Sequence, residues 1–290
     1  MEIKEKNILV PMDFRPQAEG AFNEAIGIAK QMKRQIVLLY VHQEKGALTS
    51  IFSKKQNELF DEAVNEKLSA LAMEQSQKYG VEIVTKLVHN NSVHAAIVDT
   101  ASKLKSDLIV MGRGGVNVIG SNTSRVLRCS RVPVITITGK NDVPEKYRSI
   151  LLPLDLTKET RQKVNWGIIL AKLFGAKIKV ISALWDKNNE NIVNQLKAQL
   201  VQVESFIKKQ GLECSVELVT ASEKAKTLVP IILNYAREQG DIDMILIMTQ
   251  QETGFSEFFM GSHATELIRK SEVPVMSIIP HETGQIIWGI

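Results

Sequence analysis

The stretch KNILVPMDF, residues 6–14, decides the fold because it occurs twice: it returns as RSILLPLDL at residues 148–156. Asp13 and Asp155 in these stretches are 142 positions apart. Two further pairs recur in the same order, 141 positions apart: VPVITI (132–137) with VPVMSI (273–278), and GSNTSRVLR (120–128) with GSHATELIR (261–269). Similarity at a fixed period indicates a repeated structural unit. We therefore predict a duplication, with one domain over residues 1–143 and a second over residues 144–290.

Each copy alternates short apolar runs with helical patterns. In the first copy the segments between the runs place apolar residues at helical spacing, as Phe22, Ile26 and Ala29 do. The alternation predicts a parallel sheet covered by helices on both faces. The expected fold class is α/β, with two tandem doubly wound domains of five parallel strands each and ligands at the carboxyl ends of the strands. The runs are NILVPM (7–12), QIVLLYV (35–41), VEIVTKLV (81–88), DLIVMG (107–112) and VPVITI (132–137).

The composition excludes several classes of function. The 290 residues include 36 Lys and Arg against 32 Asp and Glu, without a basic stripe, so nucleic acid is not an expected partner. No apolar run of about 18 residues and no apolar leader occurs, which favours a cytoplasmic protein that does not bind membranes. Cys129 and Cys214 lie in different halves and predict neither a disulfide nor a zinc site. His89 and His94 flank a loop, but no cysteine or carboxylate lies at ligand spacing, so we expect no metal site.

The segment MGRGGVNVIGSNTSRVLR, residues 111–128, joins a strand to a helix and has two interpretations. In the first it binds phosphate, because glycines let the backbone approach a ligand and a helix N-terminus favours an anion. In the second it is a tight turn, with Ser121 or Asn122 as the N-cap of the helix. A dinucleotide fingerprint would instead follow the first strand, and a P-loop needs a Lys that is absent here.

These features resemble the universal stress protein family in its tandem, two-domain form. The resemblance covers nearly the whole chain, once per half, and rests on ILVPMDF (8–14), LLYVH (38–42), DLIVMG, the glycine-rich loop, GS followed by VLR, and VPVITI. It implies an adenine nucleotide alpha hydrolase-like fold that binds ATP or a related adenine nucleotide. Asp13 and Val41 are then implied on the adenine or ribose side. The residues implied on the phosphate side are Pro11, Met111, Gly112, Gly115, Gly120, Ser121 and Asn122.

The first copy departs from the family pattern in the length of one loop. Nucleotide-binding members carry two glycines separated by two residues, then nine residues, then Gly-Ser or Gly-Thr. Gly112 and Gly115 fit this pattern, but only four residues separate Gly115 from Gly120. The loop that wraps the phosphates is therefore expected to be short.

The second copy departs further. Thr249 stands where the first glycine is expected, and Glu252, whose carboxylate would repel phosphate, stands near the second. Ala183 replaces Val41. We therefore predict a nucleotide pocket in the first domain and a degraded one in the second, where the weaker site residues are Asp155, Gly261 and Ser262.

Two functions remain open from the sequence. The first is a nucleotide-responsive stress-response protein. The alternative is a stress protein that binds no nucleotide and acts through protein interaction or another small ligand. No residue is placed to activate water, so the sequence predicts no catalytic residue and at most slow ATP hydrolysis.

The last strand of each copy is expected at a sheet edge, where unpaired backbone groups invite pairing. Residues 132–137 and 273–278 are therefore predicted to pair the two domains as an internal pseudo-dimer, and a homodimer is the other partner considered. The apolar tail, residues 281–290, is expected to dock on this protein or on a partner.

Overall fold

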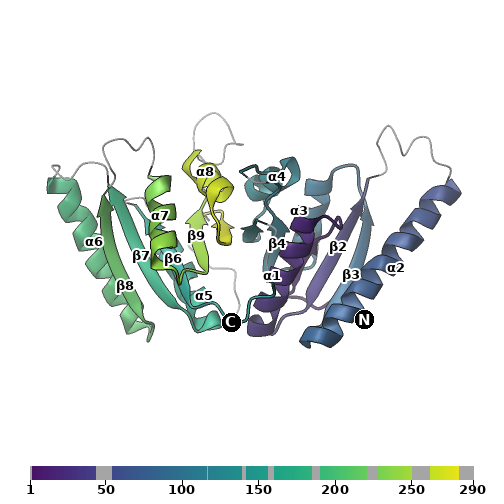
Figure 1. The fold of residues 1–290 in the computed structure, drawn as a ribbon, viewed down its shortest axis with the longest axis horizontal. Helices are drawn as coiled ribbons and strands as arrows, with labels where there is room; N and C mark the ends of the chain where they lie inside the picture. The colour runs from purple at the N-terminus through teal and green to yellow at the C-terminus, as the bar shows by residue number, and fades with distance from the viewer. Residues whose placement is uncertain are drawn as a thin grey trace. The chain divides into compact units, whose positions relative to one another are not determined.

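The structure, a computed structural model, describes residues 2–43, 54–115, 117–138, 142–155, 160–184, 190–220, 228–249 and 262–280. The chain divides into two compact units, Met1–Glu145 and Lys146–Ile290 (Figure 1). The predicted C-terminal docking segment, residues 281–290, lies outside the described residues. Within the described ranges, no helix combines the length and the apolar character needed to cross a membrane.

The first unit is a five-stranded sheet in the order β3-β2-β1-β4-β5. The neighbouring strands β1 and β2, β2 and β3, β1 and β4, and β4 and β5 all pair in parallel, as the alternation of strands and helices predicts. The elements are β1 (Ile8–Pro11), α1 (Pro16–Met32), β2 (Ile36–His42), α2 (Lys54–Tyr79), β3 (Ile83–His89), α3 (Val93–Lys103), β4 (Leu108–Gly112), α4 (Ser121–Cys129) and β5 (Val134–Ile137).

The second unit repeats this topology in the order β8-β7-β6-β9-β10, again with parallel pairs. The expectation of two tandem α/β domains with five parallel strands each is confirmed. The elements are β6 (Ser149–Leu154), α5 (Thr160–Phe174), β7 (Lys177–Leu184), α6 (Glu190–Lys209), β8 (Cys214–Thr220), α7 (Val229–Gln239), β9 (Met244–Met248), α8 (Ser262–Lys270) and β10 (Val275–Ile278).

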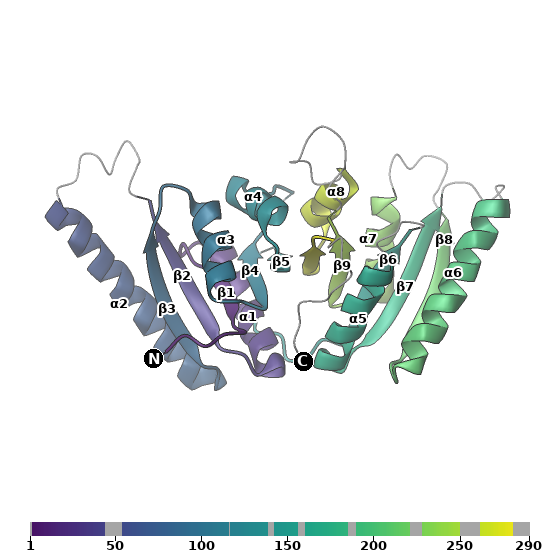
Figure 2. The ribbon, with the colours of Figure 1, turned by 180° about the vertical axis from the view of Figure 1, so that it is seen from behind.

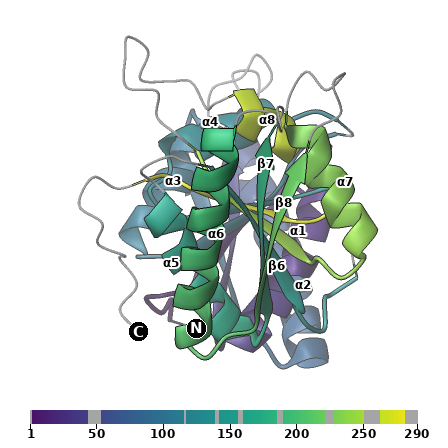
Figure 3. The same cartoon turned by 90° about the vertical axis from the view of Figure 1, so that its left-hand side faces the viewer.

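Helices cover both faces of each sheet, which explains the continuous apolar runs. In the first unit α1 lies on one face and α3 on the other, as the front and rear views show (Figures 1 and 2). In the second unit α7 and α5 lie on opposite faces in the same views, and α6 packs along β7 and β8 (Figure 3). Ile8, Leu9 and Val10 of β1 are consequently fully buried. A strand with both faces covered needs apolar residues at successive positions rather than at alternate ones.

The strand order also locates the crevice of each unit. In the first unit the chain builds outward from β1 to β2 and β3, then returns to add β4 and β5 on the other side of β1. Ligands of doubly wound sheets bind outside the carboxyl ends of the strands at this reversal. The predicted pairing of the two domains through residues 132–137 and 273–278 remains a prediction.

Candidate functional site

A cavity of about 780 Å³ opens at the carboxyl ends of β1, β2 and β4 in the first unit. The first turns of α1, α3 and α4 complete its wall. The structure brings all nine residues that the sequence predicted for this domain to the cavity: Pro11, Asp13, Val41, Met111, Gly112, Gly115, Gly120, Ser121 and Asn122.

Two glycines of the loop after β4 are required by the fold itself. A Cβ on Gly112 would lie 2.7 Å from both the Cβ and the backbone oxygen of Gln17 on α1, so this glycine permits close helix–strand packing. Gly114 has φ +116°, a conformation that favours glycine, and a Cβ there would lie 2.7 Å from the backbone nitrogen of Gly120. Neither glycine is therefore evidence for a ligand.

Two other glycines of the loop have no such structural reason. A Cβ on Gly115 would meet no atom within 4 Å, and a Cβ on Gly120 would meet nothing closer than 3.8 Å. Gly120 also has an ordinary φ of −61°. Both residues line the cavity, so the absence of a side chain at these positions keeps the cavity open without serving the packing of the chain.

The N-terminus of α4 faces the cavity without a side-chain cap. The N-cap residue is Gly120, and no side chain bonds the first turn, so the alternative with Ser121 or Asn122 as the cap is wrong. The first N–H groups of a helix have no partner within the helix and carry a partial positive charge. Here they belong to Ser121, Asn122 and Thr123, all of which line the cavity.

Two hydrogen bonds fix this helix start to the sheet. The Thr123 hydroxyl donates to the backbone oxygen of Gly112 over 2.9 Å. The Gly120 N–H donates to the backbone oxygen of Arg113 over 2.8 Å and closes the glycine loop. The anion-attracting end of α4 is thereby held in place at the end of β4.

Asp13 lies just beyond β1 with its side chain exposed to solvent. Its Oδ1 accepts a hydrogen bond from the Arg15 N–H over 3.1 Å, which closes a turn. It does not cap α1, because the N-cap residue of that helix is Arg15 and carries no side-chain cap. The carboxylate is therefore partly engaged in a local turn and still faces the cavity.

The sequence did not identify several residues of the cavity wall. Arg15 lines the cavity and is the only cation among its described lining residues. The Tyr40 ring lies at the end of β2, and its pKa is raised, first by burial and then by the charges of Asp13 and Asp61. These residues belong to no motif. Only their closeness in sequence to predicted site residues could have indicated them: Arg15 lies two positions after Asp13, and Tyr40 lies directly before Val41. The other unpredicted lining residues are Met12, Gln17, Ala18, Leu39, Gln43, Val93, Ile97, Gly114 and Thr123.

The corresponding crevice of the second unit is smaller. The described residues enclose about 180 Å³ there, with Asp155 and Ala183 in the wall. The buried side chain of Lys163 also lines this space and donates from Nζ to the backbone oxygen of Pro153 over 2.9 Å. Of the other predicted residues, Gly261, Glu252 and the side chain of Ser262 lie outside the described part of the chain.

Strand register corrects the comparison of the two glycine segments. Gly112 pairs with Ile137 in the first unit, and Met248 pairs with Ile278 in the second. Ile137 and Ile278 are corresponding residues of the repeat, so Met248, and not Thr249, stands at the position of Gly112. Thr249 corresponds to Arg113, since the N–H of each donates to the backbone oxygen of its isoleucine. Met248 lines the small cavity of the second unit.

Comparison with known proteins finds relatives among universal stress proteins. A solved universal stress protein from Archaeoglobus fulgidus matches 97% of this chain and 98% of its own at 20% identity, with a TM-score of 0.75, which shows a shared fold. A universal stress protein of Methanocaldococcus jannaschii is 29% identical over 140 residues, 46% of this chain and 81% of its own. Another Archaeoglobus fulgidus universal stress protein, solved in complex with dAMP, matches 46% of this chain at 23% identity and a TM-score of 0.37.

The family comparison covers both units. The model of the universal stress protein family matches residues 5–138 and again residues 146–278. The two matches together span most of the chain and fall one in each structural unit. This chain is therefore a member of the universal stress protein family, with two family domains in tandem.

Proposed function

We propose that the first unit binds an adenine nucleotide, ATP or a close relative, and that the protein is a nucleotide-responsive stress-response module. One observation carries the proposal: a cavity of about 780 Å³ at the carboxyl ends of the strands, lined by every residue that the family resemblance implies for the first domain. This volume lies within the range of about 300–1,000 Å³ that is usual for small-molecule sites.

The two sides of the cavity suit the two ends of a nucleotide. On the phosphate side, the uncapped start of α4 offers backbone N–H groups to an anion, and the open positions of Gly115 and Gly120 leave room for it. Arg15 adds a positive charge at the cavity wall. On the other side, Asp13 would accept hydrogen bonds from ribose hydroxyls, and the end of β2 at Val41 would border the base. We assign no catalytic residue beside the phosphates.

The second unit is proposed to bind no nucleotide. Its crevice holds about 180 Å³ between the described residues, below the usual range for a small-molecule site. Met248 and Lys163 occupy positions that Gly112 and Ala21 hold in the first unit. One nucleotide per chain is therefore the expected stoichiometry.

The test is calorimetry of the full-length, untagged chain with ATP, comparing Gly120→Asp with Gly120→Asn. The two side chains have the same size, and both suit the N-cap position, so neither should weaken α4. Asp places a negative charge about 4 Å from the proposed phosphate and should lower ATP affinity at least about 100-fold. Asn should lower it far less.

The duplication supplies a matched control. Asp155→Asn in the second unit should leave ATP binding unchanged, whereas Asp13→Asn in the first should weaken it. Unchanged ATP affinity in Gly120→Asp would reject the pocket. Absence of ATP binding by the unaltered chain would favour the alternative function, a protein-interaction module that uses no nucleotide.

A further inference from the structure

Three side chains from three elements of the first unit meet at the ends of β2 and β3. His42 is the last residue of β2 and His89 the last residue of β3, and the parallel register sets them directly side by side. Asp61 comes from α2, which packs on both strands. Each residue offers one ligand atom, a ring nitrogen from each histidine and a carboxylate oxygen from Asp61. These three atoms lie within 4.8 Å of one another.

The carboxylate lies between the two imidazoles. Oδ1 of Asp61 is 2.6 Å from Nδ1 of His42, and Oδ2 of Asp61 is 3.0 Å from Nε2 of His89. The two imidazole rings face each other with centroids 5.0 Å apart. Each of the three residues therefore turns a metal-ligating atom toward the same point.

The surroundings fix the inner ligand and leave the outer ones accessible. The His42 side chain is 8% exposed, and the ring of Phe60 packs edge-on against it at 5.1 Å between centroids. Asp61 and His89 retain 21% and 41% of their side-chain exposure. The group is thus held rigid on one side and open to an ion from solvent on the other.

We propose that His42, Asp61 and His89 form a binding site for a divalent transition-metal ion, with Zn²⁺ as the best match. Two imidazoles and one carboxylate are a typical set of three protein ligands for zinc, and water completes the coordination. Tetrahedral bonds of about 2.0–2.1 Å place ligand atoms roughly 3.3 Å apart, so the His–Asp spacings of 2.6 and 3.0 Å need to open by less than 1 Å. Mg²⁺ and Ca²⁺ prefer sets of oxygen ligands and do not suit this site.

The second unit argues against a purely structural role for the trio. The corresponding register pair on β7 and β8 is Leu184 with Thr220, so this fold places no demand for histidine at the two strand ends. The sequence analysis predicted no metal site because it did not connect Asp61 with the histidines. Asp61 lies 19 positions from His42 on a separate helix. Ligand spacing along the chain cannot identify a site that strand register and helix packing assemble.

The metal site is independent of the proposed nucleotide pocket. None of the three ligands lines the cavity of about 780 Å³, although Val41 and Gln43 beside His42 do. A failure of ATP to bind would therefore leave this inference intact, and a failure of Zn²⁺ to bind would leave the nucleotide proposal intact.

The experiment uses the full chain without a histidine tag, stripped with a chelator and titrated with Zn²⁺ by calorimetry. Co²⁺ then serves as a spectroscopic probe, because its visible absorption reports imidazole and carboxylate coordination. We expect one Zn²⁺ per chain and little binding of Mg²⁺. Asp61→Asn and His89→Ala should each weaken Zn²⁺ binding by about 10–100-fold or more. Loss of a residue that only hydrogen-bonds to a metal ligand already weakens metal binding by about this factor.

His94→Ala is the matched control, since His94 lies in the same unit and is not part of the trio. It should leave Zn²⁺ affinity and the Co²⁺ spectrum unchanged. Circular dichroism of the Asn and Ala variants verifies that each remains folded. No Zn²⁺ binding by the unaltered chain, or equal Zn²⁺ binding by folded Asp61→Asn and His89→Ala, would overturn the inference.

Discussion

The first unit holds a cavity of about 780 Å³ where the second encloses about 180 Å³ between its described residues, although their strands pair in the same register. Side chains at the strand and helix ends differ between the units: Gly112 corresponds to Met248, and Ala21 to Lys163. The strand interiors, by contrast, are apolar and buried in both units. The two copies therefore keep Pro11 and Asp13 of the crevice as Pro153 and Asp155, and differ at Gly112 and Met248.

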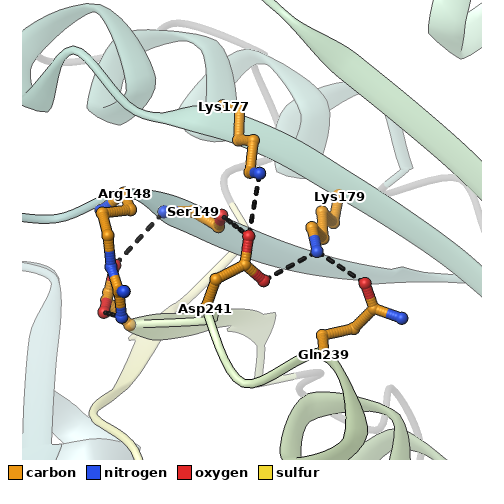
Figure 4. A network of polar contacts seen from close by, with 7 residues as sticks. Arg148, Ser149, Lys177, Lys179, Gln239 and Asp241 are labelled. Atoms are coloured by element: carbon orange, nitrogen blue, oxygen red, sulfur yellow. Dashed lines mark hydrogen bonds and ion pairs between the residues drawn. The ribbon is translucent and has the colours of Figure 1, made fainter.

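The two sheets also differ at the amino-terminal ends of their strands, which lie away from the crevice. In the second unit, Asp241 accepts from Lys177, Lys179 and Ser149, and Lys179 also donates to Gln239 (Figure 4). In the first unit, Asn7 stands at the position of Ser149, and its Oδ1 accepts from the Ser106 hydroxyl over 2.7 Å. At this position the second unit uses a charged network and the first a neutral hydrogen bond, although Arg34 and Asp107 also form an ion pair over 2.6 Å at the same end of the first sheet. Either arrangement satisfies the buried polar groups, which is what burial requires.

The largest effect is expected from giving the first unit the residue of the second, Gly112→Met. A Cβ at this position meets the Cβ and the backbone of Gln17 at 2.7–2.9 Å, so α1 or β4 must shift. Overpacking of this kind costs about 1–3 kcal/mol, and we expect the upper end because backbone atoms are struck. The side chain would also fill the cavity and abolish ATP binding. Urea unfolding followed by circular dichroism and ATP calorimetry measure the two effects.

The tryptophans make this prediction specific to one unit. All three, at positions 166, 185 and 288, lie in the second unit, so their fluorescence should report an unfolding transition close to that of the unaltered protein. Gly115→Ala is the control for stability in the same loop, because its Cβ meets open space. A Gly112→Met variant that keeps both its stability and its ATP affinity would show that the glycine–methionine difference does not explain the two crevices.

An intermediate effect is expected from Asp241→Asn, which tests the charged edge of the second unit. Burial alone would raise the pKa of Asp241, but hydrogen bonds from Lys177, Lys179 and Ser149 outweigh it and hold the pKa well below its ordinary value of 3.8. A carboxylate with a lowered pKa stabilises the fold fully above its unfolded pKa and loses this contribution as pH falls toward its folded pKa. The variant should lose about 2 kcal/mol at pH 7, the scale of a hydrogen bond to a charged group.

The pH dependence distinguishes this mechanism from a general packing defect. Urea unfolding monitored by tryptophan fluorescence should show a constant deficit at neutral pH that shrinks below about pH 4. Glu204→Gln, which removes a surface pair with Lys208 on α6, should have a smaller effect. A deficit that persists unchanged at low pH would assign the loss to shape rather than to the charge of Asp241.

The sequence was sufficient for the fold because the fold depends on patterns that a single chain displays. Repeated segments at one spacing and alternating apolar runs predicted both sheets and their parallel strands. The nine first-domain residues were implied by the family resemblance, and the topology explains why they meet: they lie at or after the carboxyl ends of β1, β2 and β4. Their role in binding a nucleotide stays a prediction.

The residues that the sequence missed depend on contacts between elements. Thr249 was aligned with Gly112 because the segment after β9 offers no glycine as a reference, and only the pairing of Met248 with Ile278 fixes the correct position. Asp61 reaches His42 through the packing of α2, which no motif records. Arg15 and Tyr40 line the cavity through loop and strand geometry, and their residue types carry no signal of their own.

The smallest effect is expected from Thr123→Val, which concerns the attachment of α4 to the sheet. The hydroxyl of this buried residue donates to the Gly112 oxygen over 2.9 Å, and the corresponding residue of the second unit is Ala264. The alanine shows that a domain of this fold does not need the bond, so the first unit should fold without it. Valine keeps the volume and removes the donor, which should cost about 1 kcal/mol. Ser124→Ala on the same turn is the control and should not destabilise the first unit.

The bond also holds the start of α4 at the phosphate side of the cavity, so Thr123→Val should weaken ATP binding more than it weakens binding of adenosine, which lacks phosphate. Equal losses for ATP and adenosine in calorimetry would mean that Thr123 supports the fold of the first unit and takes no part in the difference between the two crevices.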